Sequence, residues 1–180
     1  ESTDINSPVS FYAKTKVENE NLARQFAEKY SSNIIGLRFF TVYGPYGRPD
    51  MAYYSFSKSI VNQQPIKLFN NGDLQRDMTF ITDIVNGILN SINYFDEMKN
   101  NHEVFNLGNE KPIKTINLVK KIENSLNKKA KIINIFNINE VKITHADLTK
   151  SKKLLKYQPK IELEEGMNRF FDWFRDYYEI

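Results

Sequence analysis

Apolar residues recur at helical spacing in the first part of the chain and then give way to a short continuous apolar run. Between positions 8 and 30 they return every three or four residues with charged residues between them, which predicts an amphipathic helix. The run NIIGLRFF (33–40) is typical of a strand that is buried on both faces of a parallel sheet. The Gly- and Pro-rich segment TVYGPYGRPDM (41–51) predicts a loop.

The rest of the chain alternates between strand-like and helix-like segments. Strands are predicted at 66–70, 78–81, 104–108 and 131–137, and helices at 52–64, 82–95, 113–127, 147–157 and 163–180. This alternation predicts an α/β fold with a largely parallel sheet. The aromatic final helix carries acidic residues among its basic ones, so we expect it to pack in a core rather than to bind nucleic acid.

Composition narrows the class of protein. The 180 residues are 41% hydrophobic and 26% charged, which is ordinary for a folded domain, and no apolar run approaches the ~18–20 residues of a membrane helix. The chain has no cysteine, which excludes disulfides and thiolate zinc sites and is consistent with the cytoplasm. Its two histidines, His102 and His145, are too far apart in sequence to suggest a metal site. A net charge of +3 makes neither nucleic acid nor a membrane surface the expected partner.

Two Tyr-x-x-x-Lys pairs stand at a spacing that puts both side chains on one face of a helix. These are Tyr12/Lys16 and Tyr54/Lys58. An ammonium group close to a phenol favours the phenolate, so such a pair can supply an acid or base near neutral pH. Spacing alone is weak evidence, because about one such pair is expected by chance in a chain with 10 tyrosines. The alternative is an ordinary pair of surface side chains four residues apart. Only the first pair opens a long helix that leads directly into the predicted buried strand.

That helix, strand and loop, with the segments SFYAKTKVENE and LRFFTVYGPYGRPDMA, resemble the extended short-chain dehydrogenase/reductase family. Within it they are most similar to nucleotide-sugar epimerases and dehydratases of the UDP-glucuronate 4-epimerase type. The resemblance implies the C-terminal part of a Rossmann-type doubly wound sheet plus a smaller α/β substrate domain. It assigns residues 1–45, with a return at 82–108, to the Rossmann-type part, and residues 46–81 and 109–180 to the substrate domain.

The resemblance also implies a reaction and its catalytic residues. Tyr12 would take the proton from the sugar C4 hydroxyl, and NAD would accept the C4 hydride to leave a 4-keto sugar. The hydride and the proton would then return to the other face of the sugar. Lys16 would hold the nicotinamide ribose and promote ionisation of Tyr12, and Phe39 would approach the nicotinamide unless it is sheet core. Tyr54/Lys58 has no place in this pattern and is interpreted as structural.

For the UDP-sugar, the resemblance implies contacts from three segments. Thr41 and Arg48 would meet the sugar carboxylate, Arg76 the diphosphate, and Phe69 and Asn70 the uracil. The alternatives are an exposed loop arginine for Arg48, one half of a structural ion pair for Arg76, and core packing for Phe69. Asp77 and Asp83 are interpreted as structural acids, with Thr82 or Asp83 capping the helix that follows.

The chain departs from the family pattern in two places. Asn139 and Glu140 stand where family members often carry Gly-Asp, which puts a contact to the phosphate or ribose in doubt. The 7 glycines are scattered, and none forms the Gly-rich turn that holds a dinucleotide pyrophosphate. In the family this turn precedes the Tyr-Lys helix. We therefore expect the chain to be the C-terminal portion of an epimerase that is inactive alone.

Two other functions stay open at this stage. A 4,6-dehydratase or decarboxylase of the same family would use the same tyrosine and lysine on a different reaction path. A non-catalytic nucleotide-sugar binding module would keep only the substrate contacts. The resemblance also suggests a homodimer in the full-length protein, with the Tyr-Lys helix at the interface.

Overall fold

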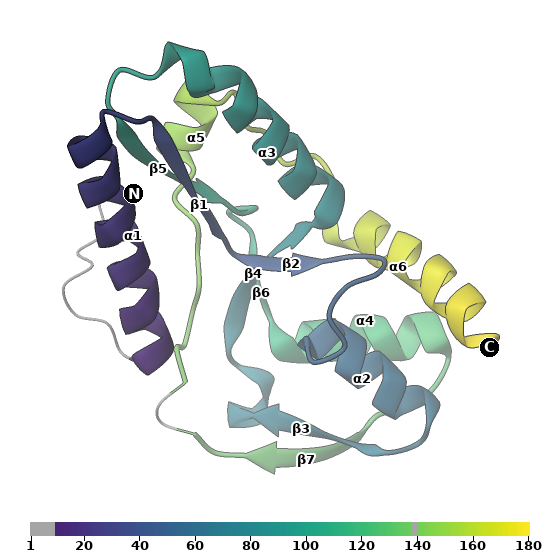
Figure 1. The fold of residues 1–180 in the computed structure, drawn as a ribbon. Helices are drawn as coiled ribbons and strands as arrows, with labels where there is room; N and C mark the ends of the chain where they lie inside the picture. Colours follow the sequence, from purple (N-terminus) through teal and green to yellow (C-terminus); the bar gives the residue numbers. More distant parts are fainter. Residues whose placement is uncertain (1–9, 138–139) are drawn as a thin grey trace. The chain divides into compact units, whose positions relative to one another are not determined.

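The structure is a computed structural model that describes residues 10–137 and 140–180 (Figure 1). The chain divides into two compact units. The first comprises the chain up to Phe39 together with Val85–Leu107 and Asp147–Gln158, and the second comprises Phe40–Ile84, Gly108–Ala146 and Pro159–Ile180. The bounds of the units differ from those that the resemblance implies: Asp147–Gln158 belongs to the first unit, whereas residues 40–45, 82–84 and 108 belong to the second. Which unit binds NAD and which binds the substrate stays a prediction.

The first unit is built on two parallel strands. β1 (Ile34–Phe39) pairs with β5 (His102–Leu107) in a register that runs from Ile34 opposite His102 to Phe39 opposite Leu107. Helix α1 (Phe11–Tyr30) lies along this pair. The unit also holds most of α3 (Ile81–Tyr94), the short 3-10 helix η2 (Phe95–Glu97) and α5 (Thr149–Leu154).

One side chain caps the start of α1, and another in its middle ties the helix to β1. At its start, the Ser10 hydroxyl accepts a hydrogen bond from the Ala13 N–H, and Ser10 is therefore the N-cap of the helix. Farther along, Arg38 on β1 donates two hydrogen bonds, of 2.7 and 2.6 Å, to the Glu20 carboxylate. These bonds hold the pKa of Glu20 below its ordinary value. The Tyr-Lys helix is thereby tied to the strand that follows it.

The second unit contains two small sheets. β4 (Gln75–Phe80) is the centre of a three-stranded sheet, with β2 (Thr41–Tyr43) parallel on one side and β6 (Pro112–Lys114) antiparallel on the other. β3 (Pro65–Phe69) pairs in parallel with β7 (Lys131–Ile135), and the 3-10 helix η1 (Asn70–Gly72) follows β3. The helices of this unit are α2 (Ala52–Val61), α4 (Thr115–Leu126) and α6 (Leu163–Tyr178).

Aromatic side chains fill the core of the second unit. Phe170 and Phe174 of α6 are buried and pack with Tyr53 and Tyr54 of α2 at ring-centroid distances of 4.9–5.9 Å. Phe171 is buried beside Phe170, with the two ring centroids 5.2 Å apart. The aromatic final helix is therefore a core element, as its sequence predicted. Across the described residues, no helix is long and apolar enough to span a membrane.

Two buried carboxylates bind backbone amides in this unit. Asp77 is fully buried and accepts hydrogen bonds from the N–H groups of Asn109 (2.7 Å), Glu110 (3.0 Å) and Ala146 (2.9 Å). Asp83 accepts from Lys160 (3.1 Å) and Ile161 (2.9 Å). Both acids have structural partners, as expected. The predicted cap by Thr82 or Asp83 is wrong, because α3 begins at Ile81 and both residues lie inside it; Asp83 binds the segment before α6 instead.

The sequence missed two strands, for identifiable reasons. β2 has only three residues and lies inside a segment whose glycines and prolines predict a loop. The helix predicted at 113–127 wrongly included the last two residues of β6, whereas the observed helix α4 begins at Thr115. β4 starts three residues earlier than predicted, because its first residues, Gln75, Arg76 and Asp77, are polar and give no strand pattern.

Two neighbouring core tyrosines give a stability prediction. The Tyr53 hydroxyl donates to the Gly44 carbonyl (3.3 Å), whereas the buried Tyr43 hydroxyl has no hydrogen-bond partner among the residues that the structure describes. Burial, with Asp83, Glu162 and Glu165 nearby, raises the pKa of Tyr43 far above its ordinary value. We expect Tyr43→Phe to increase the free energy of unfolding by about 1 kcal/mol and Tyr53→Phe to reduce it by about 1 kcal/mol. Urea unfolding measures both, and an equal loss in the two variants would contradict this account.

Candidate functional site

The first half of the candidate site is the start of α1. Tyr12 and Lys16 lie one turn apart, and the Lys16 Nζ stands 5.1 Å from the centroid of the Tyr12 ring. Tyr12 is 70% exposed, so its phenol is open to a ligand. Phe39 ends β1 in the same unit and is half exposed, so it is not sheet core in the first unit. These positions allow the predicted roles, which stay predictions.

The second Tyr-x-x-x-Lys pair has a different environment. Tyr54 on α2 is only 4% exposed, and its hydroxyl lies 3.0 Å from that of Tyr178. The Lys58 Nζ lies over the Tyr178 ring, 5.7 Å from its centroid, rather than over Tyr54. The structural interpretation of this pair is confirmed, and Tyr54 serves below as a matched control for Tyr12.

A small pocket of about 40 Å³ in the second unit brings two predicted substrate residues together. Thr41, at the start of β2, and Arg76, on β4, both line it. Thr41 is paired with Met78 across the two strands, so the short strand β2 places its side chain in the same wall as the β4 residues. The other lining residues are Ala52, Tyr53, Met78, Ile113, Thr115 and Leu118.

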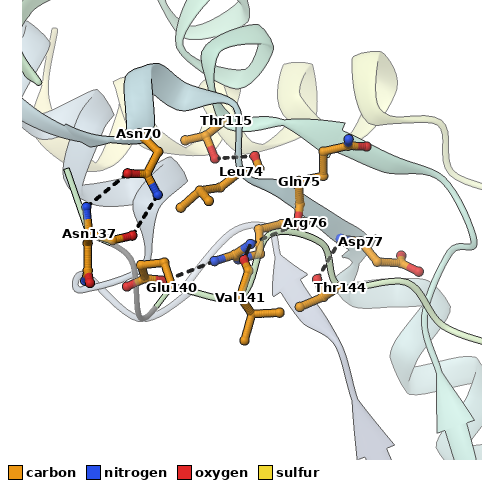
Figure 2. Close-up of polar contacts among 10 residues, drawn as sticks. All are labelled: Asn70, Leu74, Gln75, Arg76, Asp77, Thr115, Asn137, Glu140, Val141 and Thr144. Atoms are coloured by element: carbon orange, nitrogen blue, oxygen red, sulfur yellow. Dashed lines mark hydrogen bonds and ion pairs between the residues drawn. The ribbon is translucent and has the colours of Figure 1, made fainter. Parts of the chain in front are cut away.

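Arg76 is held by three acceptors (Figure 2). Its Nη1 donates to the carbonyl of Gln75 (2.9 Å) and to the carbonyl of Val141 (2.8 Å). Its Nη2 donates to Glu140 Oε2 at 3.1 Å, which forms an ion pair. The alternative of an ion pair is therefore observed, with Glu140 as the partner of Arg76.

Asn70 and Phe69 lie at the end of β3. The Asn70 side-chain amide donates to the Asn137 carbonyl (2.9 Å) and accepts from the Asn137 N–H (3.0 Å), as Figure 2 shows. This pair joins η1 to the chain after β7. Ile66 and Leu68 of the same strand are buried, whereas Phe69 points to the opposite face and is 36% exposed. Core packing of Phe69 is thus not what the structure shows.

Arg48 lies in the loop before α2. Its Nε and Nη2 donate to the two carboxylate oxygens of Asp50 at 3.1 and 2.5 Å, and these bonds hold the pKa of Asp50 below its ordinary value. Gly47 allows the loop to fold back, because a Cβ there would lie 1.7 Å from the Tyr53 hydroxyl. The exposed guanidinium already adopts the two-pronged geometry that binds a carboxylate.

Sequence reasoning missed the role of the segment after β7. Asn137, Glu140 and Val141 supply acceptors to Asn70 and Arg76, although they are more than 60 residues away in sequence. The only available signal was the unusual Asn139-Glu140 pair, noted as a departure from the family pattern; Asn139 itself lies outside the described residues.

The first unit has a Tyr-Lys helix tied to a parallel strand, and the second has a pocket with Thr41 and Arg76 in its wall. Both features are expected of an extended short-chain dehydrogenase/reductase. The model of the NAD dependent epimerase/dehydratase family matches residues 1–108, and the chain belongs to this family. The resemblance proposed from sequence is confirmed.

Three relatives illustrate the likeness. The chain is 48% identical over 176 residues to the uncharacterized protein MJ1055 of Methanocaldococcus jannaschii, which covers 97% of this chain and 52% of that protein. It is 38% identical to UDP-glucuronate 4-epimerase 1 of Arabidopsis thaliana, covering 99% and 45%. The crystal structure of UDP-glucuronic acid 4-epimerase from Bacillus cereus, in complex with UDP-glucuronic acid and NAD, matches with a TM-score of 0.85 at 31% identity, covering 96% and 55%. The chain thus spans about half the length of these relatives.

Proposed function

We propose that the chain contributes the catalytic tyrosine and the nucleotide-sugar site of an NAD-dependent enzyme that inverts C4 of a UDP-sugar, with UDP-glucuronate as the substrate. The observation that carries this proposal is the pairing of Tyr12 with Lys16 in a chain whose substrate candidates Thr41 and Arg76 line one pocket. The names of the relatives support the substrate, because curated proteins 35–39% identical to this chain are UDP-glucuronate 4-epimerases.

In this mechanism, the chain's own residues move protons and hold the substrate. The exposed Tyr12 phenol takes the proton of the C4 hydroxyl and returns a proton to C4 oxygen after the sugar has turned over. Lys16, close to the ring, stabilises the phenolate and binds the nicotinamide ribose. NAD, when bound, supplies the acceptor and donor of the C4 hydride.

The rest of the substrate is held in the second unit. Arg76 binds the diphosphate, since a guanidinium has five N–H donors in a fork that suits phosphate oxygens. Phe69 and Asn70 bind the uracil, with Phe69 offering an exposed ring face. Thr41 and Arg48 bind the sugar carboxylate. Arg48 gives up its hydrogen bonds to Asp50 when it binds this carboxylate.

The cofactor site is only partly supplied by these residues. Tyr12, Lys16 and Phe39 fit the nicotinamide side, because the first two are exposed neighbours on α1 and Phe39 is exposed at the end of β1. The 7 glycines form no glycine-rich turn for the pyrophosphate. We therefore propose that the 180 residues alone bind NAD weakly and turn over no UDP-sugar. A homodimer through α1 belongs to the same proposal.

Calorimetric titration of the chain tests the substrate assignment. We expect Arg48→Ala to weaken UDP-glucuronate binding about tenfold, because a charge-assisted hydrogen bond contributes ~1.5–3 kcal/mol and part of it is offset by release of Asp50. UDP-glucose has no carboxylate, so its affinity stays within about twofold.

The matched control is Arg169→Ala, which removes another exposed arginine that is paired with an acid, Glu165. This variant binds both UDP-sugars like the unmodified chain. Equal losses for the two UDP-sugars in Arg48→Ala would refute the carboxylate contact, and absence of binding in the unmodified chain would refute the nucleotide-sugar site.

A further inference from the structure

The guanidinium proposed to bind a diphosphate already has an anionic partner within the chain. Glu140 Oε2 lies 3.1 Å from Arg76 Nη2, and the two side chains are 35% and 26% exposed. The Gln75 and Val141 carbonyls bind the same guanidinium through Nη1. Figure 2 shows Glu140 and Val141 approaching Arg76 from a segment far away in the sequence.

These acceptors play different roles. The two carbonyls use both hydrogens of Nη1 and fix the plane of the guanidinium, without changing its net charge. Glu140 binds through Nη2 and carries a full negative charge, so it offsets the charge of Arg76. The two carbonyls thus position Arg76, and Glu140 neutralises its charge.

We propose that Glu140 is an internal counter-anion of Arg76, which the diphosphate of a nucleoside diphosphate displaces when it binds. This inference rests on the function proposed above. It makes Glu140 a determinant of affinity: the incoming anion must break the Glu140–Arg76 pair and then meets the repulsion of a nearby carboxylate.

The partly buried position of the pair gives this competition its strength. Fully exposed ion pairs are screened by water, but side chains about two-thirds buried interact through a less polar medium. Two like charges within several ångströms of each other are unfavourable there. We therefore expect the diphosphate to bind more tightly when an uncharged side chain replaces Glu140.

The test is calorimetric titration of UDP into the unmodified chain and into Glu140→Gln. Glutamine keeps the size and a hydrogen-bonding oxygen for Arg76 but has no charge. We expect UDP to bind Glu140→Gln about three- to tenfold more tightly, which corresponds to ~0.7–1.4 kcal/mol of relieved repulsion. Uridine, which has no phosphate, is expected to bind both proteins equally.

Two further variants make the result specific. Glu165→Gln removes another acid that is paired with an arginine in the same unit, and it is expected to leave UDP affinity unchanged. In an Arg76→Ala background, where UDP binds weakly, Glu140→Gln is expected to gain less than in the unmodified chain. The urea midpoint of Glu140→Gln confirms that the variant is folded.

The outcomes separate this inference from the proposed function. Suppose that Arg76→Ala loses UDP affinity but Glu140→Gln binds UDP no better than the unmodified chain. Glu140 is then not a counter-anion that competes with the diphosphate, whereas the proposal that Arg76 binds the diphosphate is supported. Weaker binding by Glu140→Gln would mean that Glu140 positions Arg76, which also overturns the inference. If Arg76→Ala binds UDP unchanged, or if no variant binds UDP, both proposals fail.

Discussion

Replacing Tyr12 with phenylalanine is expected to lower turnover of UDP-glucuronate by about a thousandfold, within the ~10²–10⁴ that a positioned acid or base contributes. The change removes only the phenolic hydroxyl that exchanges the C4 proton. Because Tyr12 is 70% exposed, its ring contributes little to packing and the variant is expected to unfold at the same urea concentration. The loss is thus expected in the rate of reaction and not in stability.

Turnover is measured in a chimera. This chain is joined to the part of the Methanocaldococcus jannaschii relative that lies outside the match, because that relative is 48% identical over 176 residues. Tyr54→Phe is the matched control, since Tyr54 has the same spacing to a lysine but is buried beside Tyr178. It is expected to keep full turnover while losing about 1 kcal/mol of stability. A Tyr12→Phe chimera that retained normal turnover would show that another group moves the proton.

Replacing Asp77 with asparagine is expected to reduce the free energy of unfolding by about 3 kcal/mol. The buried carboxylate accepts three backbone N–H groups through its two oxygens. An asparagine amide has one oxygen, so its NH₂ group must face at least one of these donors. Each buried donor left without an acceptor costs ~1–3 kcal/mol.

Urea unfolding of Asp77→Asn measures this loss, and Asp73→Asn is the control. Asp73 pairs with Lys114 on the surface, and this pair is expected to contribute nothing measurable. A midpoint for Asp77→Asn that equals that of Asp73→Asn would show that the three backbone bonds do not hold Asn109, Glu110 and Ala146 in place.

The longer elements of this fold follow from the sequence because their apolar residues recur at a regular spacing. The predicted helix at 8–30 is observed as α1 from Phe11, and the apolar run is β1. The prediction that this strand is buried on both faces is wrong, because β1 is only half-buried and Phe39 is exposed. The sequence did not predict β2 and β6, because a strand of three residues is too short to show a periodic pattern. Their pairing with β4 depends on contacts between residues that are distant in the chain. Local patterns do not encode such pairings.

In the candidate site too, local contacts could be predicted from the sequence and contacts between distant segments could not. The Tyr12–Lys16 approach follows from helical geometry and was predictable. The bonds from Arg76 to Glu140 and Val141 join positions 64 and 65 residues apart, and nothing in the local sequence of either segment specifies them. The family pattern identified Arg76 as important but not the acid that neutralises it.

The central claim is inversion at C4 of UDP-glucuronate. It is tested most directly by following the sugar proton resonances of UDP-glucuronate while the chimera acts on it with NAD. The account predicts accumulation of the C4 epimer, UDP-galacturonate, with every carbon of the sugar retained and no water lost. Release of carbon dioxide, or formation of a dehydrated sugar in place of the epimer, would contradict the account and identify the chain as part of a decarboxylase or dehydratase of the same family.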